Sequence, residues 1–430
     1  MTFSKKIKIH RIKGKKMIWW ENSFLKAKRQ KLYLGQKEAT QLAREYKTPF
    51  FIYSREQILS NFAYLLKVFT EKTSLEIRIC YAMKANPNRK ILKTLSNQGA
   101  WIDAVSPGEV REALRAGFPA KRILFTGTSI SREDLYQVFN LDDLIVNIDA
   151  LEQLELMKEV REKGFKKKKI KVSIRWNPGI GRGFNPRVIT AGKRSSDGTP
   201  IKFGIEEKKV IAAFRKAAQY GFTPVGLHQH LGSGWVREDF DAIKSAVDKM
   251  IQKASEVEKI GFRLEFLDFG GGFGPKYSKN QGLFPVKKYA EYICQKIKEA
   301  KLKIKALALE PGKYLVGDAG VLLLQVEYVK ESYGNLFACV NAGTYNTVPR
   351  TAIYAQAYHE IVNCSNIEAK DKKRVTVAGN LCETGDIFGK EILMPLPKKG
   401  DILAVLCAGA YAKSMASNFN LREIPKEIMI

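Results

Sequence analysis

The feature that most constrains this chain is an alternation of short apolar runs with amphipathic helical patterns. The apolar runs are Ile77 to Met83, Ala100 to Val105, Arg122 to Phe125, Leu144 to Ile148, Ile170 to Trp176, Pro224 to His230, Leu264 to Phe269 and Lys305 to Leu309. Helical periodicity separates most of them, over 107–116, 151–162, 206–219, 239–258 and 286–300. Eight β/α units close a parallel barrel, so the sequence predicts an α/β fold with a (β/α)8 barrel.

After Val321 the pattern changes to short strand-like runs with little helix, at 321–329, 336–340, 374–378 and 401–406. This change predicts a second, mostly β C-terminal domain that also takes N-terminal strands, because 31–34 and 49–53 read as strands too. We therefore expect four parts: a basic tail over 1–23 that could be disordered, an N-terminal segment over 24–54 that joins the β domain, the barrel over 55–310, and the β domain over 311–430. The loop 179–200 is either a mobile lid or a disordered insertion.

The charge balance is strongly basic, with 73 Lys and Arg residues against 44 Asp and Glu residues among 430. Part of the excess lies in the tail from Lys5 to Lys16 and part in the run Lys166 to Lys169. One interpretation of this charge is a surface that binds polyanions. We favour the other interpretation, that the charge reflects solvated helix faces or a basic proteome, because the basic residues form no stripe interleaved with stacking aromatics. We expect no nucleic-acid partner.

The six cysteines are far apart and form no C-x-x-C pair, so we expect neither a disulfide framework nor a zinc ribbon. The tail lacks the apolar core of a signal peptide, and no apolar run approaches membrane-spanning length. These features predict a protein of the reducing cytoplasm without a membrane partner.

The ends of the predicted barrel strands carry polar residues. They are Lys84, Asp103 with Ser106, Thr126, Asn147 with Asp149, Arg175 with Asn177, His230 with Ser233, Asp268, and Glu310 with Gly312. Any one of them could be a cap or turn residue. A barrel, however, collects all these ends around one cavity, which predicts that they form a site.

Lys84 follows an apolar strand and precedes Pro87, which ends the strand. An amine held among apolar neighbours could have a lowered pKa and form a Schiff base with an aldehyde cofactor. Taken alone, a lysine at this place more often extends to solvent.

His228 and His230 would share one face of a strand, so a metal pair is conceivable. The chain has only two other histidines and no third ligand at a familiar spacing, so we expect no metal. His230, directly before Leu-Gly-Ser, is better suited to lie flat on an aromatic ring, with Ser233 taking an anion.

The sequence Asp-Phe-Gly-Gly-Gly-Phe-Gly at 268–274 follows a strand, and its glycines would let backbone N–H groups approach a phosphate. Glu310 ends the eighth strand, where a carboxylate could keep a pyridine nitrogen protonated. Together with Lys84 and His230, these features favour pyridoxal phosphate as the cofactor.

Several motifs resemble the diaminopimelate decarboxylase family, which belongs to the pyridoxal-phosphate decarboxylases with an alanine-racemase-like barrel. They are Tyr-Ala-Met-Lys-Ala-Asn at 81–86, Asp-Ala-Val-Ser-Pro-Gly-Glu at 103–109, 228–234, 268–274, 310–320, Pro349-Arg350 with Tyr354, Cys-Glu-Thr-Gly-Asp at 382–386, Gly-Ala-Tyr at 409–411 and Ser-Met-Ala-Ser-Asn at 414–418. The resemblance runs from about Leu32 to the C-terminus.

The resemblance implies roles for individual residues. Lys84 and Cys382 would be catalytic, as the Schiff-base lysine and the proton donor. The cofactor-binding residues would be Lys84, Asp103, His230, Ser233, Gly270, Gly271, Gly272, Glu310, Gly312, Lys313 and Tyr411. The substrate-binding residues would be Lys313, Arg350, Tyr354, Glu383 and Tyr411. Cys382 and Glu383 would reach the pocket from the partner subunit, which implies a homodimer.

The implied reaction is decarboxylation of meso-2,6-diaminopimelate to L-lysine, the last step of lysine biosynthesis. Lysine stands at 313 where the family commonly has arginine, so a point charge replaces a bidentate fork. Thr351 stands where family members often have a proline directly after the substrate-binding arginine. Two alternatives remain: a related decarboxylase of another basic amino acid, of the D-ornithine, D-lysine or carboxynorspermidine type, and a non-catalytic protein that binds pyridoxal phosphate.

Overall fold

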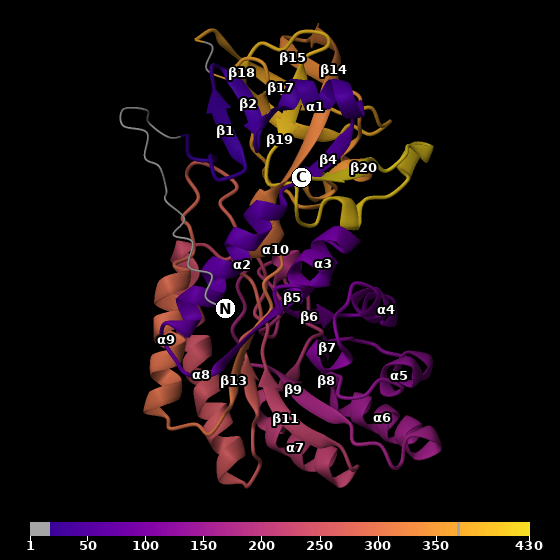
Figure 1. Cartoon of the computed structure of the whole chain (residues 1–430), viewed down its shortest axis with the longest axis vertical. Helices are drawn as coiled ribbons and strands as arrows, with labels where there is room; N and C mark the ends of the chain where they lie inside the picture. Colours follow the sequence, from indigo (N-terminus) through magenta and orange to yellow (C-terminus); the bar gives the residue numbers. More distant parts are fainter. Residues whose placement is uncertain (1–17, 368–369) are drawn as a thin grey trace.

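A computed structural model describes residues 18–367 and 370–430 of the chain. It has a barrel at one end and a β domain at the other (Figure 1). The expectation of a disordered tail falls mostly on residues 1–17, which lie outside the described residues. Trp20 is buried against the β domain, in a cluster with Phe24 and Phe50. Ile18 and Trp19 pack against the same cluster, so these residues of the expected tail lie on the β domain.

The predicted barrel is confirmed. Its strands are β5 (Glu76–Ala82), β6 (Trp101–Ala104), β7 (Ile123–Phe125), β8 (Ile145–Ile148), β9 (Lys171–Asn177), β11 (Thr223–His228), β12 (Phe266–Asp268) and β13 (Ala306–Leu309). They are parallel and pair in this order, and β13 pairs with β5 to close the barrel. A short strand that the sequence did not predict, β10 (Ile205–Glu206), pairs with β9 outside the closed ring.

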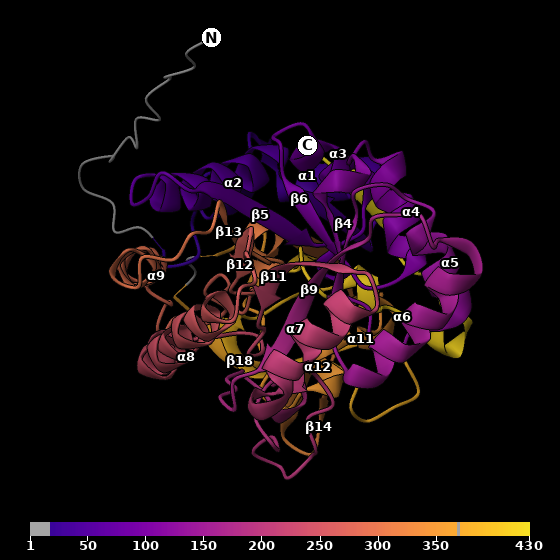
Figure 2. The same ribbon diagram turned by 90° about the horizontal axis from the view of Figure 1, so that it is seen from below.

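Helices surround the barrel (Figure 2). They are α2 (Arg55–Thr70), α3 (Arg89–Ser96), α4 (Pro107–Arg115), α5 (Arg132–Phe139), α6 (Leu151–Gly164), α7 (Val210–Gln219), α8 (Phe240–Lys259) and α9 (Val286–Glu299). Helix α2 precedes the first strand and packs between α9 and α3, so it completes the ring. The Ser54 side chain accepts a hydrogen bond from the Gln57 N–H and caps α2. Helix α7 begins at Val210 rather than at 206, because β10 and a 3-10 turn use the preceding residues.

The second domain is mostly β, as predicted. Its strands are β14 (Gly320–Ser332), β15 (Asn335–Val340), β16 (Ile361–Asn363), β17 (Lys372–Ala378), β18 (Ile387–Pro395), β19 (Ile402–Val405) and β20 (Lys426–Met429). The N-terminal strand β4 (Phe50–Tyr53) lies between β14 and β20, which confirms that N-terminal strands join this domain. A sheet of β1 (Leu25–Lys28), β2 (Lys31–Leu34) and β3 (Lys37–Glu38) and the helix α1 (Ala39–Tyr46) pack on it.

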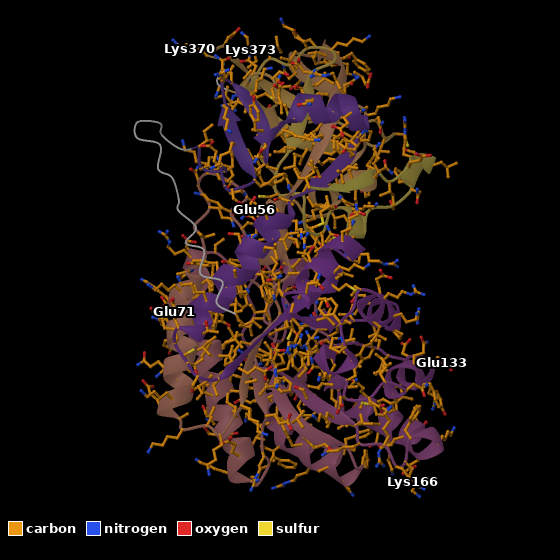
Figure 3. All side chains as sticks on the ribbon, viewed as in Figure 1. Glu56, Glu71, Glu133, Lys166, Lys370 and Lys373 are labelled. Atoms are coloured by element: carbon orange, nitrogen blue, oxygen red, sulfur yellow. The ribbon has the colours of Figure 1, made fainter. Side chains whose placement is uncertain are left out.

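In the view of Figure 3, labelled charged side chains lie on both domains. Lys166 lies at the far end of the barrel, whereas Lys370 and Lys373 lie at the opposite end of the molecule, on the β domain. Within 18–367 and 370–430, no helix is both long and apolar enough to cross a membrane.

Candidate active site

Lys84 lies in the 3-10 turn Met83–Ala85, directly after β5. Its Nζ lies 2.5 Å from Oδ2 of Asp103, which ends the neighbouring strand β6 and is fully buried. Burial favours the neutral amine, but the charge and hydrogen bond of Asp103, together with Tyr411 and Glu310, outweigh burial and raise the pKa of Lys84. The expectation of a lowered pKa is therefore wrong, because the fold places a carboxylate from 19 positions further along the chain next to the amine.

Lys84 opens into a cavity of about 180 Å³ between the barrel mouth and the β domain. The predicted site residues that line it are Lys84, His230, Ser233, Gly272, Glu310, Gly312, Lys313, Arg350, Tyr354 and Tyr411. They come from four barrel units or their loops and from two segments of the β domain. The barrel topology thus brings together residues that are more than 300 positions apart.

The glycine segment after β12 passes so close to its neighbours that side chains do not fit. A Cβ at Gly271 would lie 2.1 Å from the carbonyl oxygen of Glu310, and one at Gly272 would lie 2.2 Å from the Trp235 ring. Gly270 has a φ of +68°, and its Cβ would lie 2.5 Å from the carbonyl oxygen of Gln229. Only glycine gives this path, which leaves a backbone cradle at the cavity wall.

His230 lies two residues past the end of β11 and is held by the loop after β9. Thr190 Oγ1 lies 2.8 Å from the His230 Nδ1 and donates to its carbonyl oxygen at 2.9 Å. Burial lowers the pKa of His230 to about 3, so the ring is neutral at physiological pH. A neutral, oriented imidazole suits packing against a flat ligand ring.

Glu310 follows β13 and is 3% exposed. Burial alone would raise its pKa, but His228, whose Nε2 lies 3.2 Å from the Glu310 Oε1, outweighs burial together with His230 and Lys84, and the pKa is lowered. His228 thus has a carboxylate as its neighbour and His230 a threonine, so the two histidines differ in their partners.

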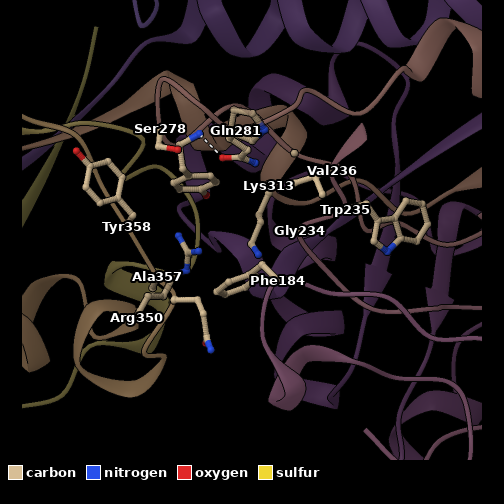
Figure 4. A pocket seen from close by; sticks show the side chains of 14 residues that line it. Phe184, Gly234, Trp235, Val236, Ser278, Gln281, Lys313, Arg350, Ala357 and Tyr358 are labelled. Carbon is tan, nitrogen blue, oxygen red and sulfur yellow. Dashed lines mark hydrogen bonds between the residues drawn. The ribbon is translucent and has the colours of Figure 1, made fainter. Parts of the chain in front are cut away.

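Lys313 and Arg350 are buried cations that both lie near the ring of Phe184. The Lys313 Nζ lies 4.5 Å and the Arg350 Cζ 5.1 Å from the centre of the Phe184 ring. Figure 4 shows Lys313 reaching toward Phe184 on the side of a second cavity, of about 240 Å³, that these three residues also line. Neither cation forms a salt bridge with an acidic residue in the described part of the chain. Burial, with the charge of Arg350, lowers the pKa of Lys313 well below its usual value.

Cys382 and Glu383 do not line this cavity. Both are exposed on the β domain, where Asn420 Nδ2 donates to the Cys382 Sγ at 3.1 Å and Tyr345 donates to Glu383 at 3.3 Å. A single chain therefore brings together the predicted cofactor residues, Arg350 and Tyr354 but not this pair.

Other residues of the site were missed from the sequence. Phe184, Val188 and Thr190 line the cavity from the loop 179–200, which follows β9 at the barrel mouth. The loop is tied down, because Phe184 N–H donates to Ser233 at 3.0 Å and Arg182 N–H donates to Leu231 at 3.0 Å. Its place after a barrel strand was the available signal, since such loops build barrel sites.

The residues present fit pyridoxal phosphate. Lys84 offers an amine, the glycine cradle offers backbone donors, and Lys313 is a buried cation that needs an anion. Glu310 is an anion at the cavity floor, which suits a protonated ring nitrogen, and His230 offers a flat face.

Comparisons with known proteins agree with this site. The sequence model of the pyridoxal-dependent decarboxylase, pyridoxal binding domain, matches residues 55–317. A diaminopimelate decarboxylase of Methanothermobacter thermautotrophicus is 37% identical over 93% of this chain and 90% of its own. The crystal structure of diaminopimelate decarboxylase from M. jannaschii superposes with a TM-score of 0.86 at 30% identity, over 95% of this chain and 93% of that one.

The Helicobacter pylori diaminopimelate decarboxylase complexed with L-lysine gives a TM-score of 0.82 at 31% identity. The superposition covers 91% of this chain and 93% of that one. Together with the barrel and its lysine, these matches show that the chain belongs to the pyridoxal-dependent decarboxylases, within the diaminopimelate decarboxylase family.

Proposed function

We propose that this protein is a carboxy-lyase that uses pyridoxal phosphate to convert meso-2,6-diaminopimelate to L-lysine, in lysine biosynthesis. The observation that carries the proposal is the cavity in which Lys84, Glu310 and the two buried cations Lys313 and Arg350 meet. The relatives named diaminopimelate decarboxylase support the same substrate.

Pyridoxal phosphate, when bound, supplies an electron sink that accepts the electron pair left as carbon dioxide departs. Lys84 would bind the aldehyde through its amine, and Asp103 holds that amine in place. Glu310 would keep the ring nitrogen protonated, and His230 would support the ring face. Gly270, Gly271, Gly272, Ser233, Gly312 and Tyr411 would hold the phosphate, with Lys313 close by.

We propose that Arg350 and Tyr354 bind the distal carboxylate of the substrate. Arg350 is 3% exposed, and its guanidinium contacts His359 and the Tyr277 ring instead of an acid. A buried cation is stabilised by an anion, and diaminopimelate carries a second carboxylate that ornithine and lysine lack. Two cations therefore favour diaminopimelate over the other basic amino acids, because one can meet the phosphate and the other the distal carboxylate.

We propose a homodimer in which Cys382 and Glu383 complete the active site of the partner subunit. Their exposure on the β domain, away from the cavity of their own chain, supports this arrangement. Cys382 Sγ, or Lys84 Nζ, then holds the proton for the carbon that loses carbon dioxide, and Glu383 binds the distal ammonium group. Six free cysteines support a reducing, cytoplasmic location.

The test is to incubate the purified protein and pyridoxal phosphate with meso-diaminopimelate, and in parallel with D-ornithine, D-lysine and carboxynorspermidine. Amino-acid analysis should find lysine formed from diaminopimelate at a far higher kcat/KM than product from the other substrates. A preference for a monocarboxylic substrate would refute the proposed roles of Lys313 and Arg350. No turnover of any substrate by protein that binds the cofactor would favour a non-catalytic binding protein.

A further inference from the structure

Three buried polar side chains form a cluster beneath the cavity, and the mechanism above uses only one of them. His228 ends β11, Asp268 ends β12, and Glu310 follows β13, so the three occupy successive strands of the barrel. His228 and Asp268 are register partners in the parallel ladder, and the Glu310 N–H donates to the Gly270 carbonyl at 2.9 Å. The barrel register itself therefore brings the three groups together.

The cluster is closed to solvent and has few other partners. His228 and Asp268 are fully buried and Glu310 is 3% exposed, and their side-chain ligand atoms lie within 4.8 Å of one another. The His228 Nε2 lies 3.2 Å from the Glu310 Oε1, although the two are not aligned as a full hydrogen bond. Within the described residues, the His228 Nδ1 and the Asp268 Oδ2 have no hydrogen-bond partner.

Burial and charge determine which members of the cluster carry a proton. Burial, and then the charge of Glu310, raise the pKa of Asp268 well above its usual value, which favours the protonated form of Asp268 beside an ionised Glu310. Its Oδ1 accepts the Gly270 N–H at 2.9 Å, so a proton on Asp268 would be carried by Oδ2, the oxygen without a hydrogen-bond partner in the described residues. His228 lowers the pKa of Glu310, so Glu310 is the member that is ionised.

The charges of the neighbouring groups are consistent with Glu310 as the single anion of this cluster. Asp103 is paired with Lys84, and His230 is neutral. A lone buried carboxylate costs far more than one that accepts hydrogen bonds, so Glu310 needs donors to remain charged before any ligand arrives.

We propose that His228 and Asp268 are positioning residues that hold Glu310 ionised and aimed at the ring nitrogen of the cofactor. This inference rests on the proposed use of pyridoxal phosphate at this site. Asp268 also joins the glycine cradle to the cluster through Gly270, so the phosphate end and the nitrogen end of the cofactor share one support.

The test compares two probes with the apoenzyme: pyridoxal phosphate, and its deaza analogue, in which C–H replaces the ring nitrogen. Glu310 can distinguish them only if it is a correctly held anion. The measured quantity is the ratio of the dissociation constant of the analogue to that of pyridoxal phosphate, followed by tryptophan fluorescence. A merely structural role of His228 would weaken both probes equally and leave this ratio unchanged.

Three variants make the test specific. In His228→Leu the ratio should fall roughly tenfold or more, because the imidazole that lies 3.2 Å from the Glu310 carboxylate and holds it charged is lost. His228→Asn should behave similarly, since its amide does not reach the Nε2 position, and it carries the test if the leucine variant does not fold. His228→Gln, whose amide nitrogen can reach that position, should keep the ratio within about threefold of the unchanged protein.

Asp268→Asn provides a matched control for the second residue. It retains the acceptor for Gly270 and a donor for Glu310, so we expect the ratio to change little, whereas Asp268→Ala should lower both the ratio and the affinity for each probe. In the active holoenzyme, His228→Asn should lower kcat while leaving the KM for diaminopimelate nearly unchanged.

An unchanged ratio in both His228→Leu and His228→Asn would overturn the proposal, as would a protein that does not distinguish the probes at all. The outcome is independent of the substrate. If the protein binds pyridoxal phosphate but releases no lysine, the proposed function fails while the ratio still decides the role of His228.

Discussion

Lys313 gives a prediction in which stability and ligand binding change in opposite directions. Its side chain is 5% exposed and faces the rings of Phe184 and Tyr411 without an acidic partner in the described part of the chain. Replacing it with methionine removes a buried charge and keeps most of the volume. Because an unpaired buried polar group costs about 1–3 kcal/mol, Lys313→Met should stabilise the apoenzyme by that amount, a few degrees in Tm.

The same substitution should weaken binding of anions. Losing a hydrogen bond to a charged group costs about 1.5–3 kcal/mol, so the dissociation constant for pyridoxal phosphate or the KM for diaminopimelate should rise roughly ten- to a hundredfold. A higher dissociation constant for pyridoxal phosphate would indicate that Lys313 binds the phosphate. A higher KM for diaminopimelate would indicate that it binds the distal carboxylate. Calorimetry of the apoenzyme and titration with each ligand measure the two effects.

The pH dependence supplies an independent check. The pKa of Lys313 is lower in the folded than in the unfolded protein, so between these two values the unfolded chain binds more protons. Apoenzyme stability contributed by this residue should therefore rise with pH from the lowered pKa up to the usual value near 10.5, and the penalty is fully present below that window. The difference between the unchanged protein and Lys313→Met should shrink as pH rises.

Lys253 is a matched control on α8. It is 7% exposed, but its Nζ lies 2.6 Å from Glu256, so its charge is paired. Lys253→Met should not raise the Tm of the apoenzyme. If Lys313→Met instead lowers the Tm and leaves both ligand affinities unchanged, Lys313 is not an unpaired cation that waits for an anion, and the reasoning is wrong.

Three further predictions test the proposed residue roles. Lys84→Ala should abolish the visible absorbance of the bound cofactor that borohydride traps, and a cofactor adduct still trapped in this variant would contradict the assignment of the lysine. Mixing inactive Lys84→Ala with inactive Cys382→Ala subunits should restore part of the activity through heterodimers with one intact site, whereas no recovery despite subunit exchange would exclude a shared site. Glu383→Gln should keep the cofactor spectrum while kcat/KM for diaminopimelate falls roughly ten- to a hundredfold, and unchanged turnover would remove Glu383 from substrate recognition.

The sequence by itself determined the fold and most of the cavity lining. Eight apolar runs matched the eight barrel strands because parallel strands buried on both faces leave a continuous apolar signal. Their polar ends, from Lys84 to Glu310, then had to meet, since a closed barrel allows no other arrangement. The glycines at 270–272 were also recognised in the sequence as a backbone that could approach a ligand closely. In the structure this backbone passes so close to its neighbours that a Cβ does not fit.

Only the tertiary structure decided the charge states and the neighbours. The pKa of Lys84 is raised rather than lowered, because its charge state depends on the 2.5 Å distance to Asp103, 19 residues away. From the sequence, His228 was considered only as a possible metal ligand together with His230. Its contact with Glu310 arises from the register of three separate strands. Coulomb and hydrogen-bond energies vary steeply over an ångström, whereas sequence patterns fix positions only to within a turn or a strand.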